Sequence, residues 1–251
     1  MQNSQSSTFK GYLLEKGILI LEEECERDNS WKLEDKTAKH ILKVIADLQW
    51  ELKGYTGLIG SRLPNCIGEL VEGCKVQIRR LKRDISNINK YSPMNNFEKE
   101  LMMKGDYFLE RAEKSIDGAR NSGYIEMIYR SMRANEICIG NINPDNIGRT
   151  DRLFIKDISR CAYNLMECDA IKFLSRAKRK GCRLNYNELI KEYVESMCLE
   201  PYSEKFITAM INYPYEFMKA CSRYRSSKKN WTEEEYVDSL REAYLKDGEE
   251  V

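Results

Sequence analysis

The chain has 251 residues, and its hydrophobic share of 42% is enough for one sizeable core, or for one large and one small lobe. Its 41 basic and 40 acidic side chains leave a formal net charge of +1, so no overall field draws it to nucleic acid or to an anionic membrane. We therefore expect neither nucleic acid nor a membrane as a partner, and local surface patches must determine which partner binds.

Several residue types are informative by their scarcity or their spacing. The N-terminus MQNSQSSTFK lacks a signal-peptide core, and the longest apolar runs fall far short of the ~20 residues of a membrane helix, which predicts a protein made and at first kept inside a cell. Nine cysteines without a Cys-x-x-Cys pair indicate reduced, mostly buried thiols. The one histidine, His40, excludes a two-histidine metal site and is expected on a helix surface.

The first elements are expected between residues 9 and 57. After a polar start, the segment FKGYLLEKGILILEEE has two short apolar stretches around Lys16 and Gly17. This pattern predicts a β-hairpin over Phe9–Glu24, in which Gly17 supplies the positive φ of the turn. From Leu33 the apolar spacing becomes helical, and it stops at Gly54 and Gly57.

Three further helices are expected before residue 135. One follows Pro64 and carries an apolar stripe from Ile67 to Ile88, while its RRLKRD segment is expected to be a solvated face rather than an anion site. The next is capped by Asn95 or Asn96 and ends near Gly123. A shorter helix then runs from Tyr124 to Met132.

Helical periodicity breaks down between Ile137 and Ile158. The segments EICIG and RLFIKDI predict short strands, and the turn-rich NINPDNIGRTD between them predicts a loop. Beyond this region, helices are expected near Cys168–Lys180, Tyr186–Met197, Ser203–Arg225 and Thr232–Leu245. Their expected N-terminal caps are Asn185, Ser203 and Thr232. Aromatic residues from Tyr202 to Tyr224 are expected in the core rather than on a base-stacking platform.

A strand, a polar loop with an asparagine and a second strand that ends in aspartate form the order that phosphoryl transfer needs in the kinase-like fold. The family's loop begins His-Gly-Asp and continues to a proline and an asparagine, and here the text is ICIGNINPDNIG and then LFIKDIS. By this resemblance Asn146 and Asp157 stand at the two metal-binding positions. Asn141 replaces the catalytic aspartate, and Ile139 replaces the histidine.

The rest of the chain resembles the spore coat protein S family of this kinase-like, aminoglycoside-phosphotransferase-like superfamily. The similar segments are LEDKTAKHILKVIADLQWELKGYTG, with Gln49 where histidine is usual, FEKELMMKGDYFLERAEKSI, CDAIKFLSRA, NELIKEYVE, INYPYEFMKACSRYRSSKKNW and EEEYVDSL. The resemblance covers residues 10 to 245. It implies an α+β, predominantly α fold: a protein-kinase-like helical lobe with a remnant β-hairpin of the small lobe.

The resemblance also implies a division of the chain and a reduced beginning. Residues 1–8 are expected to be disordered, 9–30 to form remnant small-lobe strands and the hinge, 31–246 the helical lobe, and 247–251 a flexible tail. The family's phosphate-covering loop and strand lysine have no counterpart before Phe9. A second subunit could bind the surface that the missing lobe leaves.

The residues at the site allow both a functional and a plain structural interpretation. The amide of Asn141 cannot take up a proton near neutral pH, so base assistance is lost there. Asn146 and Asp157 can share a Mg²⁺ when nucleotide phosphates complete its shell, or they can be a turn residue and a strand-end residue. Asp169 either supports the loop, as the family suggests, or caps the helix that begins near Cys168, and capping is favoured.

Three hypotheses for the function follow. The first is a non-enzymatic, pseudokinase-like interaction protein of the spore coat, found in the mother-cell cytoplasm and the coat, with other coat proteins as partners and no cofactor. The second is a weakly active phosphotransferase that uses Mg·ATP on a small molecule or protein. The third is the C-terminal part of a split kinase-like protein.

Overall fold

The computed structural model describes residues 8–21, 33–57, 61–227 and 229–251. Within them the helices are α1 (Phe9–Glu15), α2 (Asp35–Leu52), α3 (Glu69–Tyr91), α4 (Asn96–Arg120), α5 (Tyr124–Ala134), α6 (Glu167–Arg179), α7 (Tyr186–Ser196), α8 (Tyr202–Asn212), α9 (Tyr215–Ser226) and α10 (Glu233–Asp247). The strands are β1 (Leu19–Ile20), β2 (Ile137–Cys138), β3 (Ile147–Arg149), β4 (Leu153–Ile155) and β5 (Ala162–Tyr163). None of the helices in these ranges is both long and apolar enough to span a bilayer.

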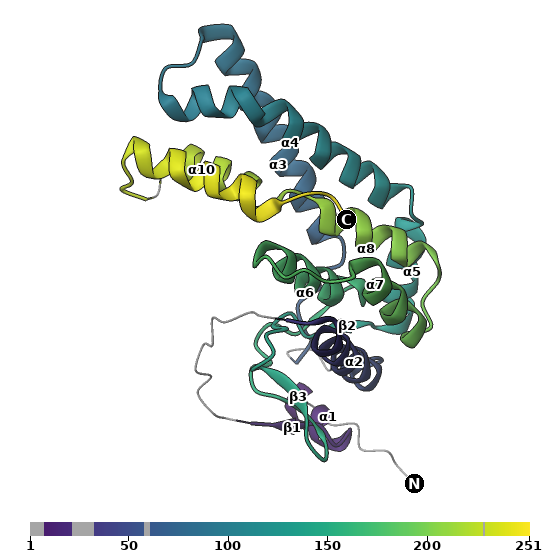
Figure 1. Cartoon of the computed structure of the whole chain (residues 1–251). Helices are drawn as coiled ribbons and strands as arrows, with labels where there is room; N and C mark the ends of the chain where they lie inside the picture. Colours follow the sequence, from purple (N-terminus) through teal and green to yellow (C-terminus); the bar gives the residue numbers. More distant parts are fainter. Residues whose placement is uncertain (1–7, 22–32, 58–60, 228) are drawn as a thin grey trace.

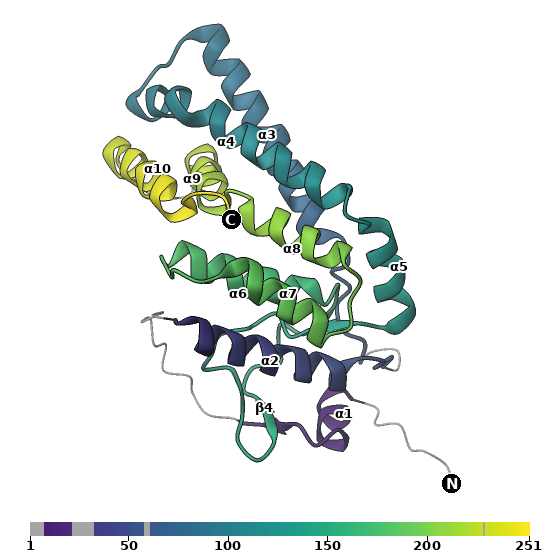
Figure 2. The same ribbon diagram turned by 45° about the vertical axis from the view of Figure 1, so that its right-hand side comes forward.

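The helices form a stack that is closed at one end by short strands (Figures 1 and 2). The long helices α3 and α4 pack together and project away from the strands. Helix α2 lies between α6 and α7 on one side and α1 with strands β1, β3 and β4 on the other. One sheet has the order β1-β4-β3, and β2 pairs with β5 in a second one. The molecule is therefore predominantly helical, as the sequence predicts.

The hairpin predicted over Phe9–Glu24 is wrong. Residues 9–15 form helix α1, because Phe9 and Leu13 are spaced four apart and both are buried, and Thr8 Oγ1 caps the helix by accepting the Gly11 N–H at 3.2 Å. Gly17 does adopt a positive φ of 73°, but it follows a helix rather than turning a hairpin. Strand β1 then pairs in parallel with β4, so its partner is distant in sequence. The predicted hinge falls mostly on residues 22–32, outside the described residues.

The helices predicted from residue 33 to residue 134 are confirmed. The Asn95 side chain caps α4 by accepting the Glu98 N–H at 2.9 Å. On α3 the buried stripe comprises Val71, Cys74, Ile78, Leu81, Ile85 and Ile88. The basic segment on the opposite face is exposed at Arg79, Arg80, Lys82 and Arg83, as expected for a solvated face.

Two predictions for the C-terminal third need correction. The single helix predicted over Ser203–Arg225 is two helices, α8 and α9, because Pro214 interrupts the helix where its ring and missing N–H cannot be accommodated. Ser203 is not a cap: it lies inside α8, fully buried, and its hydroxyl donates to Glu167 at 2.6 Å. The predicted caps Asn185 and Thr232 are confirmed.

The flexible tail predicted at 247–251 is instead anchored to the helical body. Asp247 is buried and accepts the backbone N–H groups of Glu216 and Phe217 at 3.1 and 2.8 Å. The Val251 N–H donates to the Asn212 side chain at 2.8 Å. These contacts were missed because they join residues at least 30 positions apart, which local sequence patterns do not encode.

The thiols and the histidine lie as the composition indicates. Of the described cysteines all are free thiols, and five of them are buried: Cys74, Cys138, Cys161, Cys168 and Cys221. Burial raises the pKa of Cys74, Cys161 and Cys221 to about 12, which keeps these thiols protonated and unreactive near neutral pH. His40 is exposed on α2.

Candidate functional site

The loop between β2 and β3 and the end of β4 meet at one point. Strands β3 and β4 are antiparallel, with Ile147 opposite Ile155, so Asn146 before β3 lies next to Asp157 after β4. The Asp157 N–H donates to Asn146 Oδ1 at 2.6 Å, and the Asn146 amide donates to the Asp157 carbonyl at 3.3 Å. The two residues that the sequence nominates as metal-binding positions are thus brought together.

Asn141 completes this cluster from the other end of the loop. Its Nδ2 donates to Asp157 Oδ2 at 3.0 Å, and its carbonyl accepts the Asn146 amide at 2.7 Å. A carboxylate only accepts hydrogen bonds, so the Asn141 side chain must turn its NH₂ group toward Asp157. At the position where the kinase-like pattern has an aspartate, the chain therefore presents a hydrogen-bond donor to the neighbouring carboxylate.

Asp157 is held in its ionised form. Hydrogen bonds from Ser159, whose backbone N–H lies 2.9 Å from Oδ1, lower the pKa of the Asp157 carboxyl, and the Asn141 amide and the charge of Arg160 act in the same direction. The carboxyl is half-buried rather than enclosed. It can therefore meet a ligand from the solvent side.

Asp169, at the start of α6, supports the start of the loop. It is fully buried and accepts the N–H groups of Ile139 and Gly140 at 2.7 and 3.0 Å, so the interpretation as a helix cap is wrong. Burial raises the pKa of this carboxyl. The family resemblance suggested this supporting role, whereas the local sequence suggested a cap because an aspartate near a helix start fits both.

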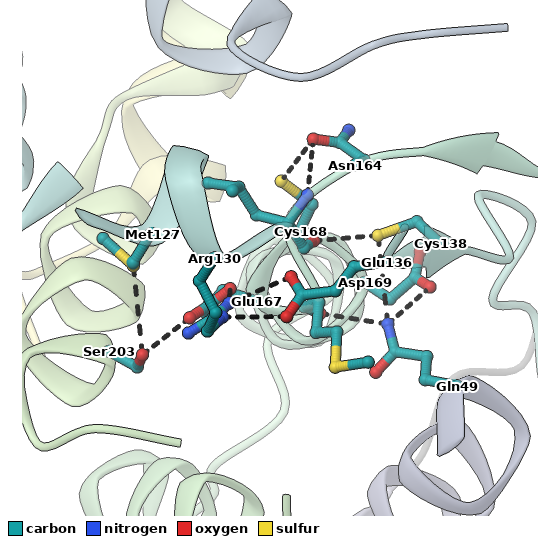
Figure 3. A network of polar contacts seen from close by, with 12 residues as sticks. Gln49, Met127, Arg130, Glu136, Cys138, Asn164, Glu167, Cys168, Asp169 and Ser203 are labelled. Carbon is teal, nitrogen blue, oxygen red and sulfur yellow. Dashed lines mark hydrogen bonds and ion pairs between the residues drawn. The ribbon is translucent and has the colours of Figure 1, made fainter. Parts of the chain in front are cut away.

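Gln49 of α2 joins the support from the other side. Its Nε2 donates to Asp169 Oδ2 and to the Met166 carbonyl, both at 3.0 Å, and its Oε1 accepts the Tyr193 hydroxyl at 2.6 Å. Figure 3 shows Gln49 directed at Asp169 from α2. These three polar contacts of the Gln49 amide tie α2 to Met166 and Asp169 at the start of α6 and to Tyr193 of α7.

A second buried network lies beside the first (Figure 3). The Arg130 guanidinium donates to Glu136 at 2.8 and 3.1 Å and to Glu167 at 2.8 Å, and Glu167 also accepts the Ser203 hydroxyl. Both carboxylates are essentially inaccessible. This network links α5, β2, α6 and α8, so it fixes the helical platform under the loop.

Gly140 is required by the close approach of two loop segments. Its φ of 74° lies in the left-handed region, and a Cβ at this position would stand 2.3 Å from the Arg160 carbonyl oxygen. The glycine of the kinase-like pattern therefore has a steric reason in this chain.

The cluster opens into a cleft of about 960 Å³. Its described lining comprises Leu21, Leu70, Gly140, Asn141, Ile142, Asn143, Asn146, Lys156, Asp157, Arg160, Ile171, Lys172, Ser175, Arg176, Arg179 and Tyr215. The sequence identified only the loop and strand-end residues of this set. The basic residues of α6 were missed, although their spacing in CDAIKFLSRAKR places Lys172, Arg176 and Arg179 on one helix face.

A kinase-like fold implies a magnesium ion with its nucleotide, and the residues fit this ion only in part. Asp157 and Asn146 offer one carboxylate and one amide oxygen, but Asn146 Oδ1 already accepts the Asp157 N–H and Asp157 Oδ2 accepts the Asn141 amide. Among the described residues no group of three acidic, histidine or cysteine side chains could hold a metal. Phosphates and water would have to supply the other ligands, so the metal site at Asn146 and Asp157 stays a prediction.

Comparison with known proteins identifies the fold and no closer family. No protein-family model and no curated protein matches the chain. The crystal structure of an aminoglycoside phosphotransferase from Alicyclobacillus acidocaldarius is similar, with a TM-score of 0.65 and 11% sequence identity over 91% of this chain. The matched region is 65% of that protein's length. The chain therefore has the predominantly helical, kinase-like fold that the sequence predicts, and this likeness concerns the fold alone.

Proposed function

We propose that this protein is a catalytically impaired, kinase-like interaction protein. One observation carries the proposal: the Asn141 amide lies in the cleft at the position of the family's catalytic aspartate and donates a hydrogen bond to Asp157. The resemblance of the loop supplies the correspondence between Asn141 and that aspartate. The hydrogen bond supplies the physical reason why the position does not act as a base.

The chemistry of the amide argues against efficient turnover. An amide does not take up a proton near neutral pH, and this one directs its NH₂ group at a carboxylate rather than an acceptor oxygen at a hydroxyl substrate. Loss of a positioned general base lowers a rate by about 10²–10⁴-fold. A protein with this cleft would bind or present ligands rather than turn them over.

The substrate class in the name of the structural neighbour does not suit this cleft. Aminoglycosides carry several protonated amino groups, whereas the described lining here contains five basic side chains and one carboxylate, Asp157. Like charges at close range repel each other. We therefore do not extend aminoglycoside phosphorylation to this chain.

The proposed setting is the spore coat, with the mother-cell cytoplasm as the place of synthesis and other coat proteins as partners. This part of the proposal is supported by the resemblance of the sequence segments to the spore coat protein S family.

A surface feature agrees with an interaction role: Ile125, Tyr129 and Met132 recur along one face of α5, and each is more than half exposed.

A second candidate function is a weakly active phosphotransferase that uses Mg·ATP. The closeness of Asn146 and Asp157 favours it, because both residues line a cleft large enough for a nucleotide. This candidate requires that magnesium and phosphates bind despite the hydrogen bonds that both side chains already make.

A thermal-unfolding titration with Mg·ATP separates the two candidates. A ligand at 100 times its dissociation constant stabilises the folded state by about 2.7 kcal/mol. We expect no magnesium-dependent stabilisation at millimolar Mg·ATP, with ATP plus EDTA as the control for binding of the phosphates alone. A saturable, magnesium-dependent increase that Asp157→Ala removes would favour the phosphotransferase.

A further inference from the structure

Helix α5 carries an apolar stripe that the rest of the described chain leaves uncovered. Ile125, Tyr129 and Met132 are 55, 56 and 57% exposed. Their spacing of four and three residues places them on one face of the helix, while the opposite face packs inward through Met127 and Ser131. Figures 1 and 2 both show α5 at the edge of the helical stack. A second molecule can therefore reach the stripe.

Two opposite charges lie on one flank of this stripe. Glu126 and Arg133 are seven residues apart, about two helical turns, and both are exposed. Neither makes an ion pair within the part of the chain that the structure describes, whereas the neighbouring Arg130 is paired with Glu136 and Glu167. Glu126 and Arg133 also line one hollow of about 470 Å³. This flank thus has an acidic end toward the start of α5 and a basic end toward its close.

Such a face is complementary to itself when two copies of α5 pack antiparallel. A twofold axis perpendicular to both helices turns one copy end for end and keeps the charged flanks of the two copies on the same side. With the axis level with Tyr129, Glu126 of each copy meets Arg133 of the other, and the two Tyr129 rings meet at the centre. Ile125 of one copy then lies beside Met132 of the other. A uniformly acidic or uniformly basic partner would match only one end of the flank.

We propose that the α5 face formed by Ile125, Glu126, Tyr129, Met132 and Arg133 binds the same face of a second copy of this chain. The proposal rests on the interaction role proposed above and names one partner for it. Burial of the three apolar side chains of each copy favours association, and the two reciprocal ion pairs fix the antiparallel direction. A helix of 11 residues provides a small interface, so we expect a dissociation constant on the order of 10 μM.

Sedimentation equilibrium of the purified full chain, at concentrations below and above that value, tests the assignment. The unaltered chain should change from monomer to dimer as its concentration rises. Glu126→Arg places two arginines at each charged contact, and Arg133→Glu places two glutamates there, so each variant should dimerise at least about tenfold more weakly.

An equimolar mixture of these two variants provides the sharpest measurement. In a dimer of one Glu126→Arg chain and one Arg133→Glu chain, both charged contacts again join an arginine to a glutamate. The mixture should therefore dimerise although neither variant does so alone at the same concentration. The double variant Glu126→Arg/Arg133→Glu restores both contacts within a single chain, and it should dimerise as the unaltered chain does.

The matched controls are Glu110→Arg on α4 and Arg83→Glu on α3, each of which reverses one charge at an exposed position outside α5. Both should dimerise as the unaltered chain does. Tyr129→Ala removes the apolar centre of the face and should weaken the dimer by at least about tenfold. Because Glu126, Tyr129 and Arg133 are all exposed, these variants should keep their circular dichroism and a melting temperature within a few degrees.

The outcomes separate this assignment from the proposed lack of turnover. A chain that stays monomeric at every concentration would overturn the dimer and leave the argument from Asn141 intact. Dimers that persist in both single-charge variants, or a mixture of the two that stays monomeric, would overturn it as well. Enzyme-like phosphoryl transfer by a chain whose dimer follows this charge pattern would leave the assignment standing and contradict the lack of turnover.

Discussion

At the scale of single residues, Asp169 fixes the position of the loop that carries Asn141. It accepts hydrogen bonds from two successive backbone N–H groups and from Gln49, and the bonds from Ile139 and Gln49 are fully buried. A buried donor that loses its acceptor destabilises the fold by the full desolvation penalty. The loop therefore depends on one buried carboxylate.

Replacement of Asp169 by alanine should lower the free energy of unfolding by about 2–4 kcal/mol, because the N–H groups of Ile139 and Gly140 and the Gln49 amide all lose their acceptor. Urea denaturation measures the change. The control is Asp238→Ala on the exposed face of α10, which should stay within about 0.5 kcal/mol of the unaltered chain. A loss below about 1 kcal/mol for Asp169→Ala would contradict the supporting role.

The sequence predicted part of this cluster and not the rest. The order of strand, polar loop and strand-end aspartate identified Asn141, Asn146 and Asp157, and they do lie together. Lys172 and Arg160 were missed as lining residues, because basic residues on a helix or loop are ordinarily solvated and the helical spacing of Lys172 does not by itself indicate a cleft. Their shared cleft arises from packing between segments that no local pattern connects.

At the scale of elements, Arg111 of α4 joins three segments at the C-terminal end of the chain. Its guanidinium donates to the carbonyls of Asn212, Gly248 and Asp247 at 2.8, 2.6 and 2.9 Å, and the side chain is 3% exposed. The planar guanidinium group of arginine carries several N–H donors in fixed directions, so it can bind all three carbonyl oxygens at once. Helices α4, α8 and α10 are thereby tied to one another.

Arg111→Ala should therefore lower the free energy of unfolding by about 2–4 kcal/mol, since it leaves three carbonyl groups without their donor. Arg111→Lys keeps the positive charge but not the planar guanidinium group, so we expect an intermediate loss of unfolding free energy. Denaturant unfolding gives the energies, and hydrogen exchange reports on the amide of Val251, which should exchange faster in the alanine variant. Unchanged exchange and stability would show that the tail is held by other contacts.

The predictions of elements succeeded where the signal is local. The Asn95, Asn185 and Thr232 caps accept the backbone N–H groups that an N-terminal cap requires, so these helix starts could be read from the sequence. The hairpin failed because FKGYLLEK also has helical apolar spacing, and because β1 finds its partner in β4 rather than in its neighbour. Parallel pairing between distant segments leaves no turn signal to predict it.

At the scale of the whole molecule, the helices form a stack with short strands at one end (Figure 2). The cleft that contains Asn141 and Asp157 is lined by residues of the loop after β2, of the segment after β4 and of α6. The kinase-like fold accounts for the position of the loop, and the buried networks around Asp169 and Arg130 account for its rigidity. Fold alone does not supply activity, which depends on the groups in the site. In the function proposed above, the Asn141 amide stands where phosphoryl transfer in this fold would need a base.

The most direct test of this claim is the rate of phosphoryl transfer and hydrolysis with γ-labelled ATP, magnesium and the purified full chain. The account predicts that the unaltered protein and Asp157→Ala, checked by circular dichroism to be equally folded, release and transfer phosphate at the same background rate. Turnover of about 1 per second or faster that Asp157→Ala abolishes would contradict it.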